Sequence, residues 1–214
     1  MITKEIADSL FDEKERGVIV LSNTIDSKML DELNEFVKKK DSSFEIKREK
    51  YIENNQLVSL IYRGPFENVA LGDTVFKDVM EHYSQLREGF NSHSKYPFKQ
   101  GTSVEVKLIH YPVSDLGVGI HRDLSSNINL VVFYNLSGST DLKTYETKTG
   151  DNPVSNFIKA GDISIMRAPR IDEEESIRPF HGVEKVLVPR TVLVIREIDE
   201  VLEEITNKDN WMGF

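Results

Sequence analysis

His121, Arg122 and Asp123 form the segment whose residue types and spacing are best suited to chemistry. On an extended strand alternate side chains point to the same side, so His121 and Asp123 face one way and Arg122 faces the other. One metal ion could therefore bind the imidazole and the carboxylate together. This H-x-D spacing alone is a weak signal, because short motifs also occur by chance. The alternative for His121 is a hydrogen-bonded histidine within a strand.

The same residues begin an H-R-D-L tetrapeptide, which also occurs in the catalytic loop of protein kinases. In that loop an asparagine follows the aspartate by five positions. Here position 128 is Ile128, and the asparagines stand one place before and one place after it. The glycine-rich loop and the D-F-G tripeptide of kinases are also missing from the sequence. The sequence therefore excludes a protein kinase.

His181 is the second histidine that could complete a metal site. It lies 58 residues after Asp123 (181 − 123) and precedes two runs that read as strands. Two imidazoles and one carboxylate form the facial triad that leaves one side of Fe(II) open. The chain has no cysteine, which excludes disulfides, thiolate zinc sites and iron–sulfur clusters. The remaining histidines, His82, His93 and His110, are interpreted as structural.

Arg190 follows His181 by nine residues (190 − 181), within an apolar run. From a strand its guanidinium would reach inward, and a planar fork is the right partner for a carboxylate. The alternative is an ion pair with the acidic C-terminal segment. Arg196 has the same parity and is expected on the same strand face. Its alternative is an ion pair at the strand end, with Glu197 or Asp199.

Together these residues resemble the Fe(II)/2-oxoglutarate-dependent oxygenase superfamily, over about residues 104–197. The resemblance rests on H-x-D, a later histidine and the arginine, in that order and in a β-rich context. It extends to Tyr111, which matches a cosubstrate-binding tyrosine of prolyl-hydroxylase-like and alkylated-base-demethylase-like members, and to the Gly-Asp turn in 160–169. It implies a double-stranded β-helix (jelly roll) in which iron is bound by His121, Asp123 and His181, the catalytic centre. Arg190 would bind the far carboxylate of 2-oxoglutarate, with Tyr111 assisting.

The activity implied by this resemblance is a dioxygenase that hydroxylates a small polar molecule and releases succinate and carbon dioxide. Its cofactors would be Fe(II), 2-oxoglutarate and dioxygen, with ascorbate as reductant. Asp123 favours hydroxylation, since halogenating relatives have alanine or glycine there. Two alternatives stay open: the same chemistry on a nucleobase or a protein side chain, and a cupin-like metal protein without oxidation. A cupin has no need for an arginine that binds a dicarboxylate, as is expected of Arg190.

Arg196 is also a candidate for cosubstrate binding, because the R-x-x-x-x-x-R spacing of Arg190 and Arg196 mimics that of the nucleic-acid demethylases. Against that branch, Ile109 stands where its asparagine is expected. Candidate substrate-binding residues are Arg167, Arg170 and Arg63. Their cations would suit a carboxylate or phosphate on the substrate. The alternative is that these arginines pair with Asp172–Glu175 in solvent.

Length and charge limit the class of protein further. The 214 residues suit a single domain, 1–214, and the net charge of −9 opposes a nucleic-acid partner. The acidic runs 171–176 and 196–205 are expected to be solvated. The sequence has no signal peptide and no apolar run long enough to span a membrane, so a cytoplasmic protein without a membrane partner is expected. The sequence does not indicate an oligomeric state.

The hydrophobic pattern predicts the elements that must position these residues. Apolar runs predict strands at 17–23 and 56–64, and helical spacing predicts helices within 24–40 and 72–90. From about residue 102 short β-rich runs alternate with Gly, Asn, Asp and Pro, which is typical of a sandwich or barrel. The predicted fold is α+β and mainly β. Residues 1–100 would form the helical and β support, 101–198 the jelly-roll catalytic core and 199–214 a C-terminal tail.

Overall fold

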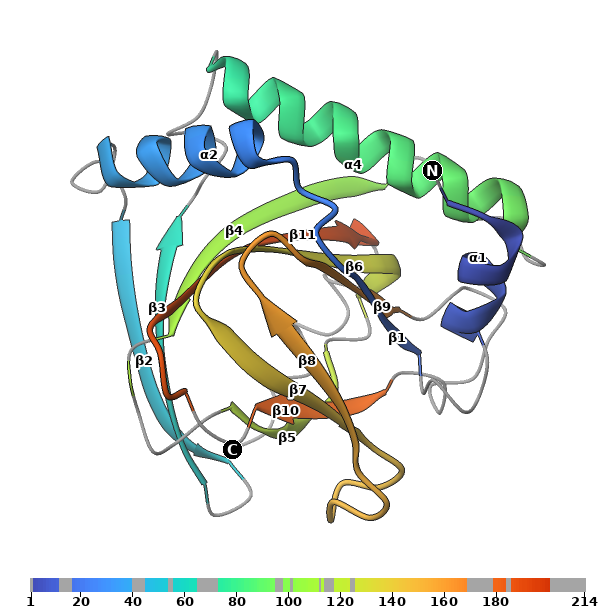
Figure 1. Ribbon diagram of the computed structural model, residues 1–214. Coiled ribbons are helices and arrows are strands. Elements are labelled where there is room, and N and C mark those ends of the chain that lie inside the picture. The colour runs from blue at the N-terminus through green and yellow to red at the C-terminus, as the bar shows by residue number, and fades with distance from the viewer. Residues whose placement is uncertain are drawn as a thin grey trace.

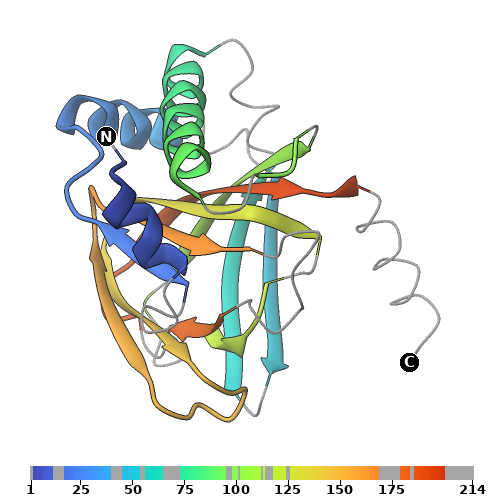
Figure 2. The same ribbon diagram turned by 90° about the vertical axis from the view of Figure 1, so that its right-hand side faces the viewer.

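Two antiparallel β-sheets face each other in this protein, and helices lie against the outer face of the larger sheet (Figure 1). The computed structural model describes residues 2–11, 17–39, 45–53, 56–64, 73–94, 98–100, 102–111, 113, 118–123, 126–168, 179–183 and 186–200. At residue 11 and in 45–64 it describes the backbone alone. Figure 2 shows the layers from the side, with the smaller sheet opposite the helices.

The larger sheet has seven strands in the order β1-β9-β6-β11-β4-β3-β2. Their bounds are β1 Val18–Leu21, β9 Ile163–Arg167, β6 Asn127–Ser137, β11 Arg190–Ile198, β4 Ser103–Tyr111, β3 Gln56–Gly64 and β2 Glu45–Glu53. Strands from both halves of the sequence therefore join one sheet. The predicted strands at 17–23 and 56–64 are confirmed as β1 and β3.

The smaller sheet has four strands in the order β5-β10-β7-β8. Their bounds are β5 Val118–His121, β10 Phe180–Val183, β7 Ser139–Tyr145 and β8 Val154–Lys159. The chain alternates between the sheets, because β4, β6, β9 and β11 lie in the larger one and the strands between them in the smaller one. This is the double-stranded β-helix, and the predicted fold class is confirmed.

Three helices occur in the described part of the chain: α1 Lys4–Phe11, α2 Ser27–Lys39 and α4 Thr74–His93. The two predicted helices are confirmed as α2 and α4, whereas the sequence reading did not find α1. Asp73 caps α4, its carboxylate accepting a hydrogen bond from the Val75 amide at 3.0 Å. Val75, Val79, Tyr83 and Phe90 recur on one buried face of α4, as an amphipathic helix requires. No described helix is both long and apolar enough to cross a lipid bilayer.

Alternation along β11 supplies two different cores. Leu193 and Ile195 belong to the core beneath the helices, whereas Val192 and Val194 belong to the core between the sheets. Arg190 shares the parity of the second pair. It therefore points into the space between the sheets, where the candidate functional residues also lie.

The expectation that the acidic run 196–205 is solvated is wrong at its start. Glu197 has no exposed surface, and its carboxylate accepts hydrogen bonds from Tyr83 Oη at 2.8 Å, Arg87 Nε at 2.9 Å and Asn129 Nδ2 at 2.7 Å. A buried carboxylate is tolerated when it is paired and hydrogen-bonded in this way. Because side chains alternate along β11, Glu197 points toward α4, where its carboxylate pairs with the guanidinium of Arg87.

Candidate metal centre and adjoining cavity

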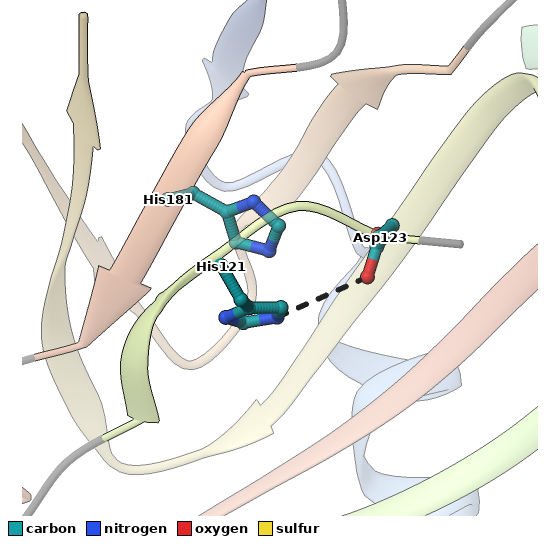
Figure 3. A group of neighbouring side chains, drawn as sticks. All are labelled: His121, Asp123 and His181. Carbon is teal, nitrogen blue, oxygen red and sulfur yellow. Dashed lines mark ion pairs between the residues drawn. The ribbon is translucent and has the colours of Figure 1, made fainter. Parts of the chain in front are cut away.

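The three residues predicted to form a metal site lie together at one end of the smaller sheet (Figure 3). His121 ends β5, Asp123 follows it, and His181 lies directly opposite His121 on the neighbouring strand β10. Opposed residues of an antiparallel pair share a face, so both imidazoles point into the space between the sheets. Their ring centroids are 4.3 Å apart, and one ligand atom from each of the three residues lies within 4.8 Å of the others.

Both imidazoles are oriented by backbone carbonyls. His121 Nδ1 lies 2.8 Å from the Gly119 carbonyl oxygen, and His181 Nδ1 lies 3.2 Å from that of Pro179. A carbonyl can only accept, so Nδ1 is the donor in each ring, and Nε2 is the atom left to bind a metal. Metal-binding histidines are commonly held by such hydrogen bonds. The two Nε2 atoms are therefore prepared to act as ligands.

The protonation state of His181 also suits a ligand. Burial, and secondly the neighbouring His121 ring, lower the pKa of His181 to about 4. The imidazole is therefore neutral at neutral pH, which is the form that coordinates metal. Two nitrogen donors and one carboxylate, with no thiolate, fit Fe(II) in the facial-triad manner. If the three residues hold a metal, the His181 ring enters the complex without losing a proton.

Asp123 lies near the guanidinium of Arg196 as well as near His121. Its Oδ1 lies 4.0 Å from His121 Nε2 and 3.8 Å from Arg196 Nη2. Arg196 reaches this position from β11, and its Nη1 lies 4.0 Å from Glu105 of β4. The predicted alternative partners of Arg196, Glu197 and Asp199, are not its ion-pair partners among the described residues. The structure instead places Arg196 beside a candidate ligand.

Arg190 is a buried cation that pairs with no carboxylate among the described residues. Its side chain is almost wholly buried, and its Nε and Nη2 donate to Asn135 Oδ1 at 3.2 and 2.5 Å. The guanidinium carbon lies 5.2 Å from the centre of the Tyr111 ring. Burial lowers the pKa of Arg190, which reflects the cost of an uncompensated charge. An anionic ligand would remove this cost.

A cavity of about 70 Å³ connects the metal group to Arg190. This volume is several times the roughly 10–15 Å³ that one water requires. The cavity is lined by Ile109, Tyr111, Val118, His121, Asp123, Phe133, Leu142, Ser164, His181, Gly182, Val183, Arg190 and Arg196. Its wall therefore combines three candidate ligands, two guanidiniums and an apolar surface. We refer to it as the large cavity.

Of the three candidate substrate-binding arginines, the structure describes the side chain of Arg167 alone. Arg167 ends β9 and lines a second, smaller cavity that also touches Asp123. Arg63 lies in β3, where its side chain is outside the described residues, as is all of Arg170. The structure therefore brings one of the three to the candidate metal group.

Sequence reasoning missed a contact on the outer side of the metal group. The guanidinium carbon of Arg122 lies 3.8 Å from the centre of the Phe180 ring, a cation–π stack. Arg122 stands between the two ligands of β5, and Phe180 directly precedes His181. The stack therefore connects the chain segments that carry the candidate ligands. No local sequence pattern predicts this contact, because only the register between β5 and β10 brings the two residues together.

The structure is a jelly roll in which two histidines and a carboxylate lie beside a buried arginine. Comparison with solved structures finds the same fold. The chain matches a prolyl hydroxylase from Trichoplax adhaerens, solved with a peptide of hypoxia-inducible factor, with TM-score 0.67 and 16% identity over 94% of this chain and 93% of that one. It matches a Pseudomonas putida prolyl-4-hydroxylase with TM-score 0.59 and 13% identity, over 92% and 98% of the two chains.

A third solved structure is SnoN, an α-ketoglutarate-dependent epimerase of nogalamycin biosynthesis, with TM-score 0.61 and 14% identity over 92% of this chain and 82% of that one. No protein-family model and no curated protein sequence matches the chain. The protein therefore has the fold of the 2-oxoglutarate- and Fe(II)-dependent oxygenases. The predicted resemblance is confirmed at the level of the fold.

Proposed function

We propose that the protein is an Fe(II)- and 2-oxoglutarate-dependent oxygenase that hydroxylates a small polar molecule. The observation that carries this proposal is the large cavity, which has a two-histidine, one-carboxylate group and a buried arginine in its wall. His121, Asp123 and His181 would hold the iron. The iron would supply the activation of dioxygen, one oxygen atom of which enters succinate as 2-oxoglutarate loses carbon dioxide, while the other enters the hydroxylated substrate. The chain itself supplies ligands and orientation.

Arg190 would bind the far carboxylate of 2-oxoglutarate. The two hydrogen bonds that Arg190 donates to Asn135 orient the guanidinium, and a bound carboxylate would neutralise its charge. Tyr111 pairs with Arg190 across β4 and β11, so its ring lies on the same wall. Arg196 adds a second positive charge to the cavity that would receive this dianion. A non-oxidative cupin-like protein would not require this arrangement.

Hydroxylation is favoured over halogenation because Asp123 occupies the place that a halide would need. Both imidazoles and the carboxylate are within reach of one ion, so a halide has no free protein position in the group. The structural neighbours include prolyl hydroxylases and an epimerase, so this fold accommodates more than one outcome.

The proposal is tested by the products. Incubation with Fe(II), ascorbate, 2-oxoglutarate and pooled metabolites should release succinate, together with a metabolite whose mass increases by one oxygen. His181→Ala should abolish succinate release and tight Fe(II) binding. The matched control is His93→Ala, which changes a histidine at the end of α4, outside the candidate centre. Succinate release that persists in His181→Ala would contradict the proposal.

A nucleobase is the second candidate substrate, because Arg196 lies in the same cavity as Arg190 with the spacing found in the demethylases. The acidic net charge of −9 opposes this candidate. Binding to a short oligonucleotide at low salt separates the two. Affinity that falls steeply with added salt would favour the nucleobase, and the absence of binding would favour the small molecule.

A further inference from the structure

Asn135 lies on the face of β6 that points into the space between the sheets. It shares the parity of Val131, which belongs to the core between the sheets, and it lies opposite Val192 of β11. Asn135 is only 1% exposed, and its Oδ1 accepts both hydrogen bonds that Arg190 donates. Which donors of Arg190 a ligand can reach therefore depends on Asn135.

The side-chain amide of Asn135 has one favourable orientation. Its Nδ2 donates to the Asp162 carbonyl at 2.9 Å and to the Phe133 carbonyl at 3.3 Å. Carbonyl oxygens can only accept, so Nδ2 must face them and Oδ1 must face Arg190. A flipped amide would place its N–H groups against the guanidinium and its oxygen against two carbonyls. The oxygen that accepts from Arg190 is therefore fixed from the opposite side.

The carbonyl that orients Asn135 belongs to the Gly-Asp turn before β9. Asp162 is buried, and its carboxylate accepts hydrogen bonds from the backbone amides of Asn23 at 2.9 Å and Lys159 at 3.0 Å. The backbone amide of Asn135 donates to the Asp162 carbonyl at 3.1 Å, and that of Gly161 donates to the Asn135 carbonyl at 2.9 Å. Asn135 is therefore tied to this turn through its side chain and through both of its backbone polar groups.

The backbone of Arg190 is fixed as well. Arg190 pairs with Tyr111 in the ladder between β11 and β4. Gly138 lies against the start of β11, where a Cβ on it would come within 2.9 Å of the Arg190 Cα. Gly138 also has φ +74°, so this close approach requires glycine. With its backbone and its guanidinium both held, Arg190 has a defined position in the absence of a ligand.

The contact with Asn135 occupies one edge of the guanidinium. An arginine has five N–H donors in a planar fork, and the Nε donor and one Nη2 donor meet Asn135 Oδ1. The other three (5 − 2), both on Nη1 and the second on Nη2, have no hydrogen-bond acceptor among the described residues. Because Arg190 lines the large cavity, the Nη1–Nη2 edge is the one left for a carboxylate there.

Asn135 also holds Arg190 without cancelling its charge. An amide oxygen is a neutral acceptor, whereas a carboxylate at this position would neutralise the guanidinium and reduce its attraction for an anion. The buried Glu197 shows the contrast, because its carboxylate forms an ion pair with Arg87 at 2.9 Å. Buried charges in proteins are normally paired with an opposite charge. The charge of Arg190 is therefore oriented but still open to an anionic partner.

We propose that Asn135 is a positioning residue for cosubstrate binding. It presents the Nη1–Nη2 edge of Arg190 to the large cavity and leaves the positive charge of Arg190 for the far carboxylate of 2-oxoglutarate. The inference rests on the proposed function and adds a residue that acts through Arg190 without touching the dianion. It also gives the Gly-Asp turn a role, because Asp162 orients the amide.

A double-mutant cycle separates positioning from a general structural role. Calorimetric titration of the Mn(II)-loaded protein with 2-oxoglutarate gives the dissociation constant for the wild type, Asn135→Ala, Arg190→Met and the double variant. Asn135→Ala should raise this constant roughly tenfold in the wild-type background and less than about twofold in the Arg190→Met background, because Asn135 acts through Arg190. Equal fold-changes in the two backgrounds would overturn the inference.

Two controls accompany the cycle. Asn127→Ala removes another buried asparagine of β6, one that does not line the large cavity, and should keep the wild-type affinity for 2-oxoglutarate. Asn135→Ala should keep the wild-type affinity for Mn(II), because Asn135 is not one of the candidate ligands. Weakening of 2-oxoglutarate binding by Asn127→Ala to the same degree as by Asn135→Ala would assign the effect to the fold and overturn the inference.

The wild-type complex provides a test that does not depend on the folding of Asn135→Ala. A crystal structure with Mn(II) and N-oxalylglycine, an inert mimic of 2-oxoglutarate, should show a carboxylate of the mimic on Nη1 and Nη2 of Arg190, with Nε still bonded to Asn135. A carboxylate bound at Nε in place of Asn135 would overturn the inference and leave the proposed function intact. Failure of the wild-type protein to bind 2-oxoglutarate at all would overturn the proposed function and this inference with it.

Discussion

Arg196 Nη2 lies 3.8 Å from Asp123 Oδ1, so a guanidinium of the larger sheet faces the carboxylate that follows β5. The two residues are 73 positions apart (196 − 123), and the contact spans the space between the sheets. It places a positive charge in the wall of the large cavity, close to the candidate metal group. The same charge would attract a dianionic cosubstrate.

Replacement of Arg196 should therefore weaken 2-oxoglutarate binding. We expect Arg196→Met to raise the dissociation constant about tenfold, the effect of removing about 1.4 kcal/mol of electrostatic attraction. Arg196→Lys, which keeps the charge, should retain most of the affinity. Calorimetric titration of the Mn(II)-loaded protein with 2-oxoglutarate measures both. Unchanged affinity in Arg196→Met would limit Arg196 to an ion pair with Asp123 and Glu105.

Replacement of Arg190 should have a larger effect. Two charge-assisted hydrogen bonds contribute about 3 kcal/mol or more, so Arg190→Met should weaken 2-oxoglutarate binding by at least about 100-fold. Arg190→Lys should also raise the KM for 2-oxoglutarate, because an ammonium lacks the planar fork. Metal affinity should change little in either variant. Ordinary cosubstrate binding by both variants would show that another residue binds the far carboxylate.

The Arg122–Phe180 stack should stabilise the metal group from outside. A cation–π contact contributes about 0.5–2 kcal/mol, so Phe180→Leu should weaken Co(II) affinity about two- to thirtyfold. Phe180→Tyr keeps an aromatic face and should restore the affinity. The Co(II) absorption spectrum reports ligand geometry and should shift in Phe180→Leu alone. Equal Co(II) affinities for the leucine and tyrosine variants would leave the stack no role in metal binding.

His82 should make folding stability depend on pH. Burial lowers the pKa of His82 below 6.5, and its Nδ1 lies 3.0 Å from the Tyr134 hydroxyl. Below pH 6.5 the unfolded chain binds a proton that the folded protein resists, so the free energy of unfolding should fall as the pH drops from 6.5 toward the lower folded pKa. His82→Gln should flatten this decline in denaturant titrations at several pH values. An equally steep decline in the variant would assign the effect to other groups.

The sequence was sufficient for local features of the site. Strand parity placed Arg190 and Arg196 on one face of β11, and alternation placed His121 and Asp123 on one side of the chain. The structure shows both arrangements. Each depends only on the two-residue period of a strand, which is independent of tertiary structure.

Features that depend on long-range register could not be predicted. The direct opposition of His181 and His121 fixes the Arg122–Phe180 stack, and no local pattern encodes it. The burial of Glu197 could not be predicted for the same reason. Only the position of α4 shows that this acidic residue of a charged run is buried.

The proposed function requires one metal ion shared by His121, Asp123 and His181, and one dianion bound by Arg190. An anaerobic crystal structure with Mn(II) and N-oxalylglycine, an inert mimic of 2-oxoglutarate, tests both at once. We predict a metal bound by Nε2 of His121, Nε2 of His181 and the Asp123 carboxylate, with the far carboxylate of the mimic on Arg190. A metal held by other residues, or a mimic whose carboxylate avoids Arg190, would contradict the account.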